Sequence, residues 1–195
     1  MTQDDVGKLY AQLDKLAEGD VLVLAGSVPK CLPDSIYRDI LERLKGRGIL
    51  FVVDATKDLL LNVLEYGPFL IKPNSHELGE IFGVELHTRE EVVPYARKLQ
   101  EKGAGNVLVS MSGQGAVLVD EKGGVHALPA PKGTLVNAVG AGDSMVAGFL
   151  AGWTEKRDYE HAFRMGISTG SASAFSEQLA TKEEVERIFF TLENA

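Results

Sequence analysis

The chain has 195 residues, a length that fits one domain of ordinary size with a full hydrophobic core. Its formal net charge is −8, from 28 acidic and 20 basic residues, which argues against a general nucleic-acid binder and against an anionic membrane surface as partner. The single cysteine, Cys31, cannot form an internal disulfide, and the sequence shows neither a signal-peptide pattern nor a membrane-spanning apolar run, so we expect one cytoplasmic domain over residues 1–195.

The first half of the sequence alternates amphipathic helices with short apolar strands. Apolar residues repeat at helical spacing after Thr2 and Asp5, which form a plausible helix cap. Pro33 opens another helical segment, and Gly46 ends it. The elements expected here are a helix over 6–17, a strand over 21–25, a helix from 33 to about 45, a strand over 49–53, a short helix over 59–64, a strand over 69–71 and a helix over 75–82.

The second half continues the alternation and adds a hairpin. Thr88 and Glu91 form a capping box for a helix to about residue 102, and Pro94 is expected to kink that helix or delay its start. The remaining elements are strands over 107–109, 116–119 and 125–127, of which the last two form a hairpin, and helices near 143–155, 158–176 and 182–193. Unbroken apolar strands between amphipathic helices indicate an α/β fold with a largely parallel sheet covered on both faces.

A glycine-rich segment, Gly140-Ala141-Gly142-Asp143, opens one of these helices. The first backbone N–H groups of a helix have no partner within it, and the helix dipole adds about half a positive charge at that end, so the segment suits an anion. Asp143 beside such an anion hole is a candidate general base for a hydroxyl group. The alternative is a tight turn followed by a first-turn acid that stabilises the dipole by ~0.3 to 1 kcal/mol.

Three loops after strands carry further candidate residues, because ligands of open parallel sheets bind beyond the carboxyl ends of the strands. These loops are Gly26-Ser27, Lys72-Pro73-Asn74 with Glu77, and residues 110–115. The second and third of these loops also have a purely structural interpretation. Asn74 and Glu77 can cap the following helix, Lys72 can be a solvated surface lysine, and the glycines of 110–115 can serve an ordinary loop.

Taken in this order, the motifs resemble the ribokinase-like, or PfkB, family of carbohydrate kinases, and within it the branch that phosphorylates fructose 1-phosphate or tagatose 6-phosphate. Val139 to Ser144 resembles the family's GAGD signature, and Asn74-Ser75-His76-Glu77 is similar to its N-x-x-E motif. The resemblance implies a three-layer αβα fold. It also implies a nucleotide-binding role for residues near the strand ends and on one late helix, namely Lys72, Asn74, Ser110, Ser112, Gly113, Gly115, Gly170, Ser171 and Ala174.

The same resemblance implies a reaction and its cofactors. Asp143 takes a proton from a sugar hydroxyl while that oxygen attacks the γ-phosphate of ATP, and the backbone of Gly140, Ala141 and Gly142 stabilises the transferred charge. Asn74 and Glu77 influence Mg²⁺ through water, and Gly26 with Ser27 lies near the sugar phosphate. Gly166, Gly170, Ser171, Ala172 and Ser173 have a second interpretation, which is close packing of their helix against the sheet.

The sequence departs from the family in one large respect: nothing corresponds to the N-terminal portion that supplies sugar contacts, the first strands and a β-lid. We therefore expect the chain to phosphorylate a sugar inefficiently by itself, and to need a missing N-terminal half or to form a homodimer. One alternative function is a noncatalytic nucleotide-binding fragment. Another is a dinucleotide-binding oxidoreductase, although the third glycine of G-x-G-x-x-G is absent after Gly142.

Overall fold

The computed structural model describes residues 3–193. Thr2, half of the predicted first helix cap, lies outside the described residues. The chain divides into two compact units, Met1–Leu86 with Pro94–Leu108 and His87–Val93 with Val109–Ala195. The six strands form a single sheet in chain order. The prediction that the chain is one domain stays a prediction.

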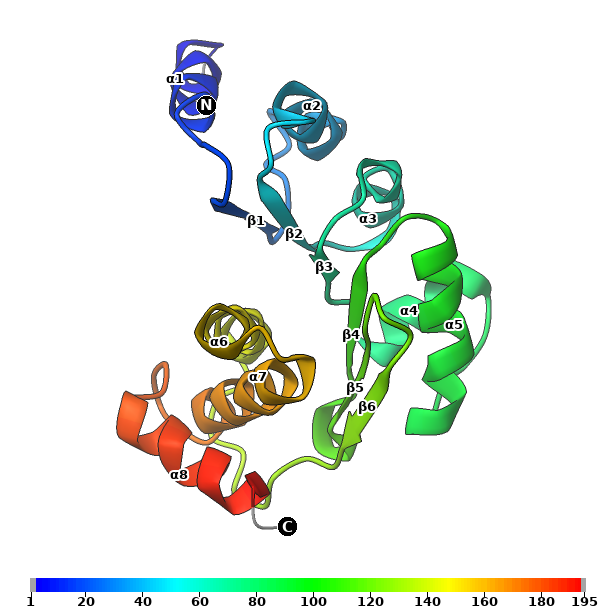
Figure 1. The fold of residues 1–195 in the computed structure, drawn as a ribbon, viewed down its shortest axis with the longest axis vertical. Helices are drawn as coiled ribbons and strands as arrows, with labels where there is room; N and C mark the ends of the chain where they lie inside the picture. Colours follow the sequence, from blue (N-terminus) through cyan, green and yellow to red (C-terminus); the bar gives the residue numbers. More distant parts are fainter. Residues whose placement is uncertain (1–2, 194–195) are drawn as a thin grey trace. The chain divides into compact units, whose positions relative to one another are not determined.

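The first unit is built on parallel strands with helices between them. In Figure 1 these strands follow one another side by side, and the connecting helices run along them. The strands are β1 (Val21–Ala25), β2 (Leu50–Asp54), β3 (Leu70–Ile71) and β4 (Asn106–Ser110), the last reaching two residues into the second unit. The helices are α1 (Gln3–Leu13), α2 (Ile36–Leu44), α3 (Lys57–Leu61), α4 (Ser75–Phe82) and most of α5 (Arg89–Glu101), with a 3-10 turn at Leu64–Tyr66.

The core of the first unit explains the unbroken apolar runs of its sequence. Val52 and Val53 of β2 and Leu70 and Ile71 of β3 are fully buried, because both faces of these central strands are covered. Strand β1 differs. It pairs with β2 alone among the described strands, and Val21 and Val23 on one of its faces are 39% and 42% exposed.

The second unit combines a hairpin with three helices. Strands β5 (Ala116–Val119) and β6 (Val125–Leu128) pair antiparallel, as predicted. Helices α6 (Ala141–Lys156) and α7 (Tyr159–Ala174) pack closely through glycines, and α8 (Lys182–Glu193) packs on α7. A Cβ on Gly148 would lie 2.6 Å from Thr169 Cβ and 2.7 Å from the Met165 carbonyl oxygen, so only glycine allows this approach.

Most predicted elements are confirmed, and a few are not. The first helix ends at Leu13 rather than 17, and the helix expected over 59–64 is instead α3 followed by the 3-10 turn. The predicted delay at Pro94 is wrong, because α5 begins at Arg89 with the proline inside it. The Thr88–Glu91 capping box forms and fixes that start, with the Glu91 carboxylate accepting the His87 N–H at 2.7 Å and the Thr88 N–H at 3.2 Å. Within residues 3–193, no helix has the length and apolar character needed to cross a bilayer.

Candidate active site

The glycine-rich segment forms the start of α6. Gly140 adopts a left-handed conformation with φ of 79°, and the helix begins directly after it at Ala141, two residues earlier than predicted. The Ala141 N–H closes the preceding turn on the Ala138 carbonyl oxygen at 3.2 Å, and the Ser144 N–H makes the first i to i−4 bond, to Gly140, at 2.8 Å. Asp143 lies in the first turn and is exposed. The N-terminal N–H groups of α6 and the Asp143 carboxylate therefore occupy the same helix end.

Helix α7 packs against the N-terminal end of α6. A Cβ on Gly170 would lie 3.0 Å from the Ala141 carbonyl oxygen, so the two helices approach closely beside the segment. The buried Ser173 hydroxyl donates to the Ser144 hydroxyl at 2.9 Å. The structure thus places Gly170, predicted to bind the nucleotide, beside Ala141, predicted to stabilise the transferred charge. Gly170 does serve close packing, but against α6 and not against the sheet as the alternative interpretation had it.

The C-terminal end of α7 holds the segment that leads into the glycines. The Ala174 carbonyl oxygen accepts the Val136 N–H at 2.9 Å and the Asn137 N–H at 3.1 Å. Several large apolar side chains around this segment are exposed, and a Cβ on Gly140 would touch the Leu179 side chain at 3.0 Å. The exposed fractions are 66% for Leu135, 53% for Val136, 82% for Val139 and 67% for Leu179. These residues were not predicted from the sequence, because a lone apolar side chain in a loop carries no periodic signal.

The loop after β4 contains a strained residue. Ser112 has φ of 49°, a left-handed conformation that a non-glycine residue adopts at a cost of roughly 1 to 3 kcal/mol and that is enriched at functional sites. Gly115 has φ of 96°, and its N–H donates to the Ser112 carbonyl oxygen at 3.0 Å. A Cβ on Gly115 would clash with the backbone after β6, at 2.6 Å from Pro129 C. The structural role expected of Gly115 is therefore confirmed. Ser110 ends β4, and Gly113 lies in the 3-10 turn Ser112–Gln114.

In the first unit, Asn74 and Glu77 form the capping box that starts α4. The Glu77 N–H donates to Asn74 Oδ1, and the Asn74 N–H donates to Glu77 Oε2, both at 2.8 Å. Their structural interpretation is confirmed, and their predicted influence on Mg²⁺ stays a prediction. No cluster of three or more acidic, histidine or cysteine side chains able to hold a metal occurs within residues 3–193. The oxygen-rich pair fits Mg²⁺ held through its own water molecules, which this ion retains readily.

Lys72 is a buried lysine, so its interpretation as a solvated surface residue is wrong. It directly follows β3, its side chain is 8% exposed, and its Nζ lies 3.1 Å from Asp54 Oδ2. Asp54 ends β2, one residue beyond the strand expected from the sequence, and was not predicted as a site residue. The signal available in the sequence was a carboxylate at the carboxyl end of a buried strand.

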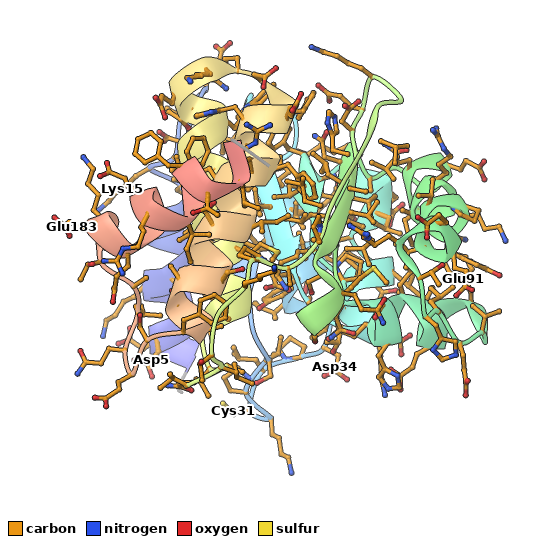
Figure 2. The ribbon with its side chains drawn as sticks, turned by 90° about the horizontal axis from the view of Figure 1, so that it is seen from below. Asp5, Lys15, Cys31, Asp34, Glu91 and Glu183 are labelled. Atoms are coloured by element: carbon orange, nitrogen blue, oxygen red, sulfur yellow. The ribbon has the colours of Figure 1, made fainter. Side chains whose placement is uncertain are left out.

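The loop after β1 reaches the same group of strand ends in the first unit. The Gly26 N–H donates to the Asp54 carbonyl oxygen at 3.1 Å, with Gly26 at φ of 83°. Ser27 follows and is exposed. Cys31 lies in the exposed loop that leads to α2 (Figure 2).

A model of the pfkB family of carbohydrate kinases matches residues 2–185. The chain belongs to this family. Its pfkB relatives include the 1-phosphofructokinase of Bacillus subtilis, 48% identical over 188 residues, which cover 96% of this chain and 62% of the relative. The D-tagatose-1-phosphate kinase of Klebsiella oxytoca is 32% identical over 176 residues, which cover 90% of this chain and 58% of the relative. The chain thus spans about three fifths of the length of these relatives.

The pfkB fold is also confirmed by a solved structure. The phosphofructokinase-2 of Escherichia coli, in complex with substrates and products, matches with a TM-score of 0.92 and 28% identity. The match covers 99% of this chain and 64% of the E. coli chain. The three-layer α/β fold and the family resemblance predicted from the sequence are therefore confirmed for the part of the family's length that this chain spans.

Proposed function

We propose that this chain is the nucleotide-binding and catalytic part of an ATP-dependent sugar-phosphate kinase of the cytoplasm. The observation that carries the proposal is the start of α6, where an exposed carboxylate and the N-terminal N–H groups of a 16-residue helix lie together. This combination suits phosphoryl transfer, because catalysis of that reaction rests on positioning and on neutralising charge. Membership of the pfkB family supports the same conclusion.

The names of the relatives support a ketohexose monophosphate as acceptor. We take fructose 1-phosphate as the first substrate to test, because the 48% identical relative is a 1-phosphofructokinase. The tagatose phosphates follow, tagatose 6-phosphate from the sequence resemblance and tagatose 1-phosphate from the name of the second relative. The product is the corresponding bisphosphate, together with ADP.

In the proposed mechanism, Asp143 accepts the proton of the sugar hydroxyl as that oxygen forms a bond to the γ-phosphorus of ATP. The bond between this phosphorus and the β,γ-bridging oxygen breaks, and ADP leaves. N–H groups of Gly142 and Asp143 donate to the oxygens of the transferred group, where charge is redistributed in the transition state. When bound, Mg²⁺ neutralises phosphate charge, and Asn74 and Glu77 order its water molecules.

The remaining candidate residues serve the two substrates. The exposed side chains of Val136, Val139 and Leu179 offer an apolar surface to the adenine ring, beside the glycine segment that takes the phosphates. Gly26 and Ser27 contribute to the acceptor side. The other nucleotide contacts come from the ammonium group of Lys72, the strained loop after β4 and the small residues of α7, namely Ser110, Ser112, Gly113, Gly115, Gly170, Ser171 and Ala174.

The test measures binding and transfer separately. Titration calorimetry of the 195-residue chain with MgATP tests the nucleotide site, with NAD⁺ as the probe for the oxidoreductase alternative. ADP release with fructose 1-phosphate is then measured for the chain alone and for a chimera that adds the part of the Bacillus subtilis relative outside the matched region. We expect MgATP binding by the chain alone and turnover by the chimera.

In the chimera, Asp143→Asn should lower kcat by at least ~10²-fold, as loss of a general base does. Glu183→Gln is the matched control, because Glu183 is a first-turn acid of α8 on the exposed surface (Figure 2). It should leave turnover unchanged. Absence of MgATP binding would refute the nucleotide site. Binding without turnover in any form would establish the noncatalytic alternative, and normal turnover by the Asp143→Asn variant would refute the proposed base.

A further inference from the structure

Asp54 and Lys72 meet because two neighbouring parallel strands end in the same register. Val53 of β2 is paired with Ile71 of β3, so the next residue on each strand is Asp54 on one and Lys72 on the other. The Lys72 N–H donates to the Val53 carbonyl oxygen at 3.3 Å, which continues the ladder to this point. The two side chains then form an ion pair of 3.1 Å at the carboxyl ends of the strands.

The pair is largely removed from water. The side chains of Asp54 and Lys72 are 17% and 8% exposed, whereas the Asp4–Lys8 pair of α1 is 77% and 70% exposed. Burying two charges costs more desolvation free energy than an apolar pair of the same size, so a buried ion pair is weak evidence for a stabilising role. A functional role for the charged Lys72 side chain therefore explains the buried ion pair better than a contribution to the stability of the fold does.

Besides its contact with Lys72, Asp54 contacts the loop that follows β1. Its carbonyl oxygen accepts the Gly26 N–H, and the Tyr37 hydroxyl of α2 donates to the Ala25 carbonyl oxygen at 2.9 Å. Burial raises the pKa of Tyr37, and the charge of Asp54 raises it further, so the hydroxyl lies within the field of this carboxylate. Asp54 is thus held between the loop after β1 and the lysine.

A lysine needs such a partner more than an arginine does. Its ammonium is a point charge on a flexible four-carbon stem with several rotatable bonds. One carboxylate at 3.1 Å restricts the stem, and an ammonium has three N–H donors, so the pairing leaves donor capacity for a further anion.

We propose that Asp54 is a positioning residue that holds the Lys72 ammonium at the end of β3, ready to donate to the phosphate oxygens of a nucleotide. This inference rests on the proposed kinase function. It assigns Asp54 no contact with the reacting atoms. Its effect on the nucleotide passes through Lys72.

The test compares a ligand that has phosphates with one that lacks them. Dissociation constants of MgATP and of adenosine are measured on the 195-residue chain by calorimetry, with adenosine in displacement format. Asp54→Asn should weaken MgATP binding about tenfold, the order expected for a charge-assisted hydrogen bond, and adenosine binding less than twofold. General damage to the fold would weaken both ligands alike. Asp4→Asn, which breaks the exposed pair of α1, should change neither.

Two further variants show whether the effect passes through the lysine. In the background of Lys72→Met, the Asp54→Asn change should add less than a twofold loss of MgATP affinity, because its target is gone. Asp54→Glu should keep the ion pair and the fold but displace the ammonium, and should give an intermediate loss of affinity for MgATP alone. This variant carries the test if Asp54→Asn fails to fold.

The outcomes separate this inference from the function on which it rests. A wild-type chain that binds no MgATP would refute the proposed nucleotide site. A wild-type chain that binds MgATP, with Asp54→Asn and Asp54→Glu binding it equally well, would refute only the positioning role. Equal losses for MgATP and adenosine, or additive losses with Lys72→Met, would also refute it.

Discussion

The Gly148→Ala variant tests whether close packing of α6 on α7 limits the stability of the second unit. Gly148 lies in the interior of α6 and is buried against α7. Intrinsic helix propensity alone predicts that alanine stabilises the helix by about 0.8 to 1.0 kcal/mol relative to glycine. The packing predicts the opposite sign.

The magnitude follows from what the new Cβ would meet. It would lie 2.6 Å from Thr169 Cβ and 2.7 Å from the Met165 carbonyl oxygen, where ordinary contacts are 3.4 Å or longer. The Met165 carbonyl oxygen belongs to the backbone of α7, and the Thr169 hydroxyl donates a hydrogen bond to it at 2.8 Å. Moving either group away from the new Cβ would therefore cost free energy. Overpacking of this kind costs ~1 to 3 kcal/mol. With two such contacts we expect the upper end, and a net loss of about 2 kcal/mol after the gain in propensity.

Urea unfolding followed by tryptophan fluorescence suits this test, because Trp153 is the only tryptophan of the chain and stacks on Tyr159 at 4.4 Å within the same unit. The matched control is Ala147→Gly, at the neighbouring exposed position of α6, which should lose about 1 kcal/mol through propensity alone. The Gly148→Ala variant should unfold at lower urea and, because α6 carries the glycine segment, bind MgATP more weakly. A higher urea midpoint than wild type would refute the packing argument.

Two further predictions concern the hydrogen bonds of single carboxylate and amide groups. Asn74→Ala removes the cap of α4 and should cost about 1 kcal/mol, seen as faster hydrogen exchange of the first-turn amides of α4; unchanged exchange would contradict the capping role. Burial raises the pKa of Asp120, but hydrogen bonds from His126, Gly124 and Lys122 outweigh it and hold that pKa below its usual value. The stability that Asp120 contributes is therefore present above the unfolded-state pKa of about 3.9 and is lost as the pH falls through the lower folded-state pKa. Asp120→Asn should reduce the fall in urea midpoint as the pH is lowered from about 5, above the unfolded-state pKa, to about 3, below it, and equal falls would contradict the assignment.

The elements predicted most accurately from the sequence are those whose bounds depend on residues close together in the chain. The helix over 75–82 has the predicted bounds because its cap, Asn74 with Glu77, and its apolar face lie within a few residues of each other. The strand over 21–25 is an unbroken apolar run between turn residues, and it too was predicted correctly. The glycine segment was placed at a helix start for the same reason.

The rest depends on contacts between residues distant in the chain. Asp54 was missed because its significance comes from the register of β2 against β3, which no local pattern encodes. The interpretation of Lys72 as a solvated surface residue was wrong for the same reason, because its partner Asp54 lies on the neighbouring strand. At Pro94 two local rules conflicted, and the capping box at Thr88 and Glu91 prevailed, because α5 begins at Arg89 and continues past the proline.

Strand β1 pairs with β2 alone among the described strands, and this bears on the behaviour of the 195-residue chain in solution. Val21–Ala25 is a run of five apolar residues without charge or proline, a composition typical of segments that assemble into intermolecular sheets. Natural edge strands are usually protected by an inward charge, a bulge or a proline, and in this strand the nearest charge is Asp20, just outside it. For the 195-residue chain we therefore expect slow aggregation through β1 to limit the concentration at which ligand titrations can be run.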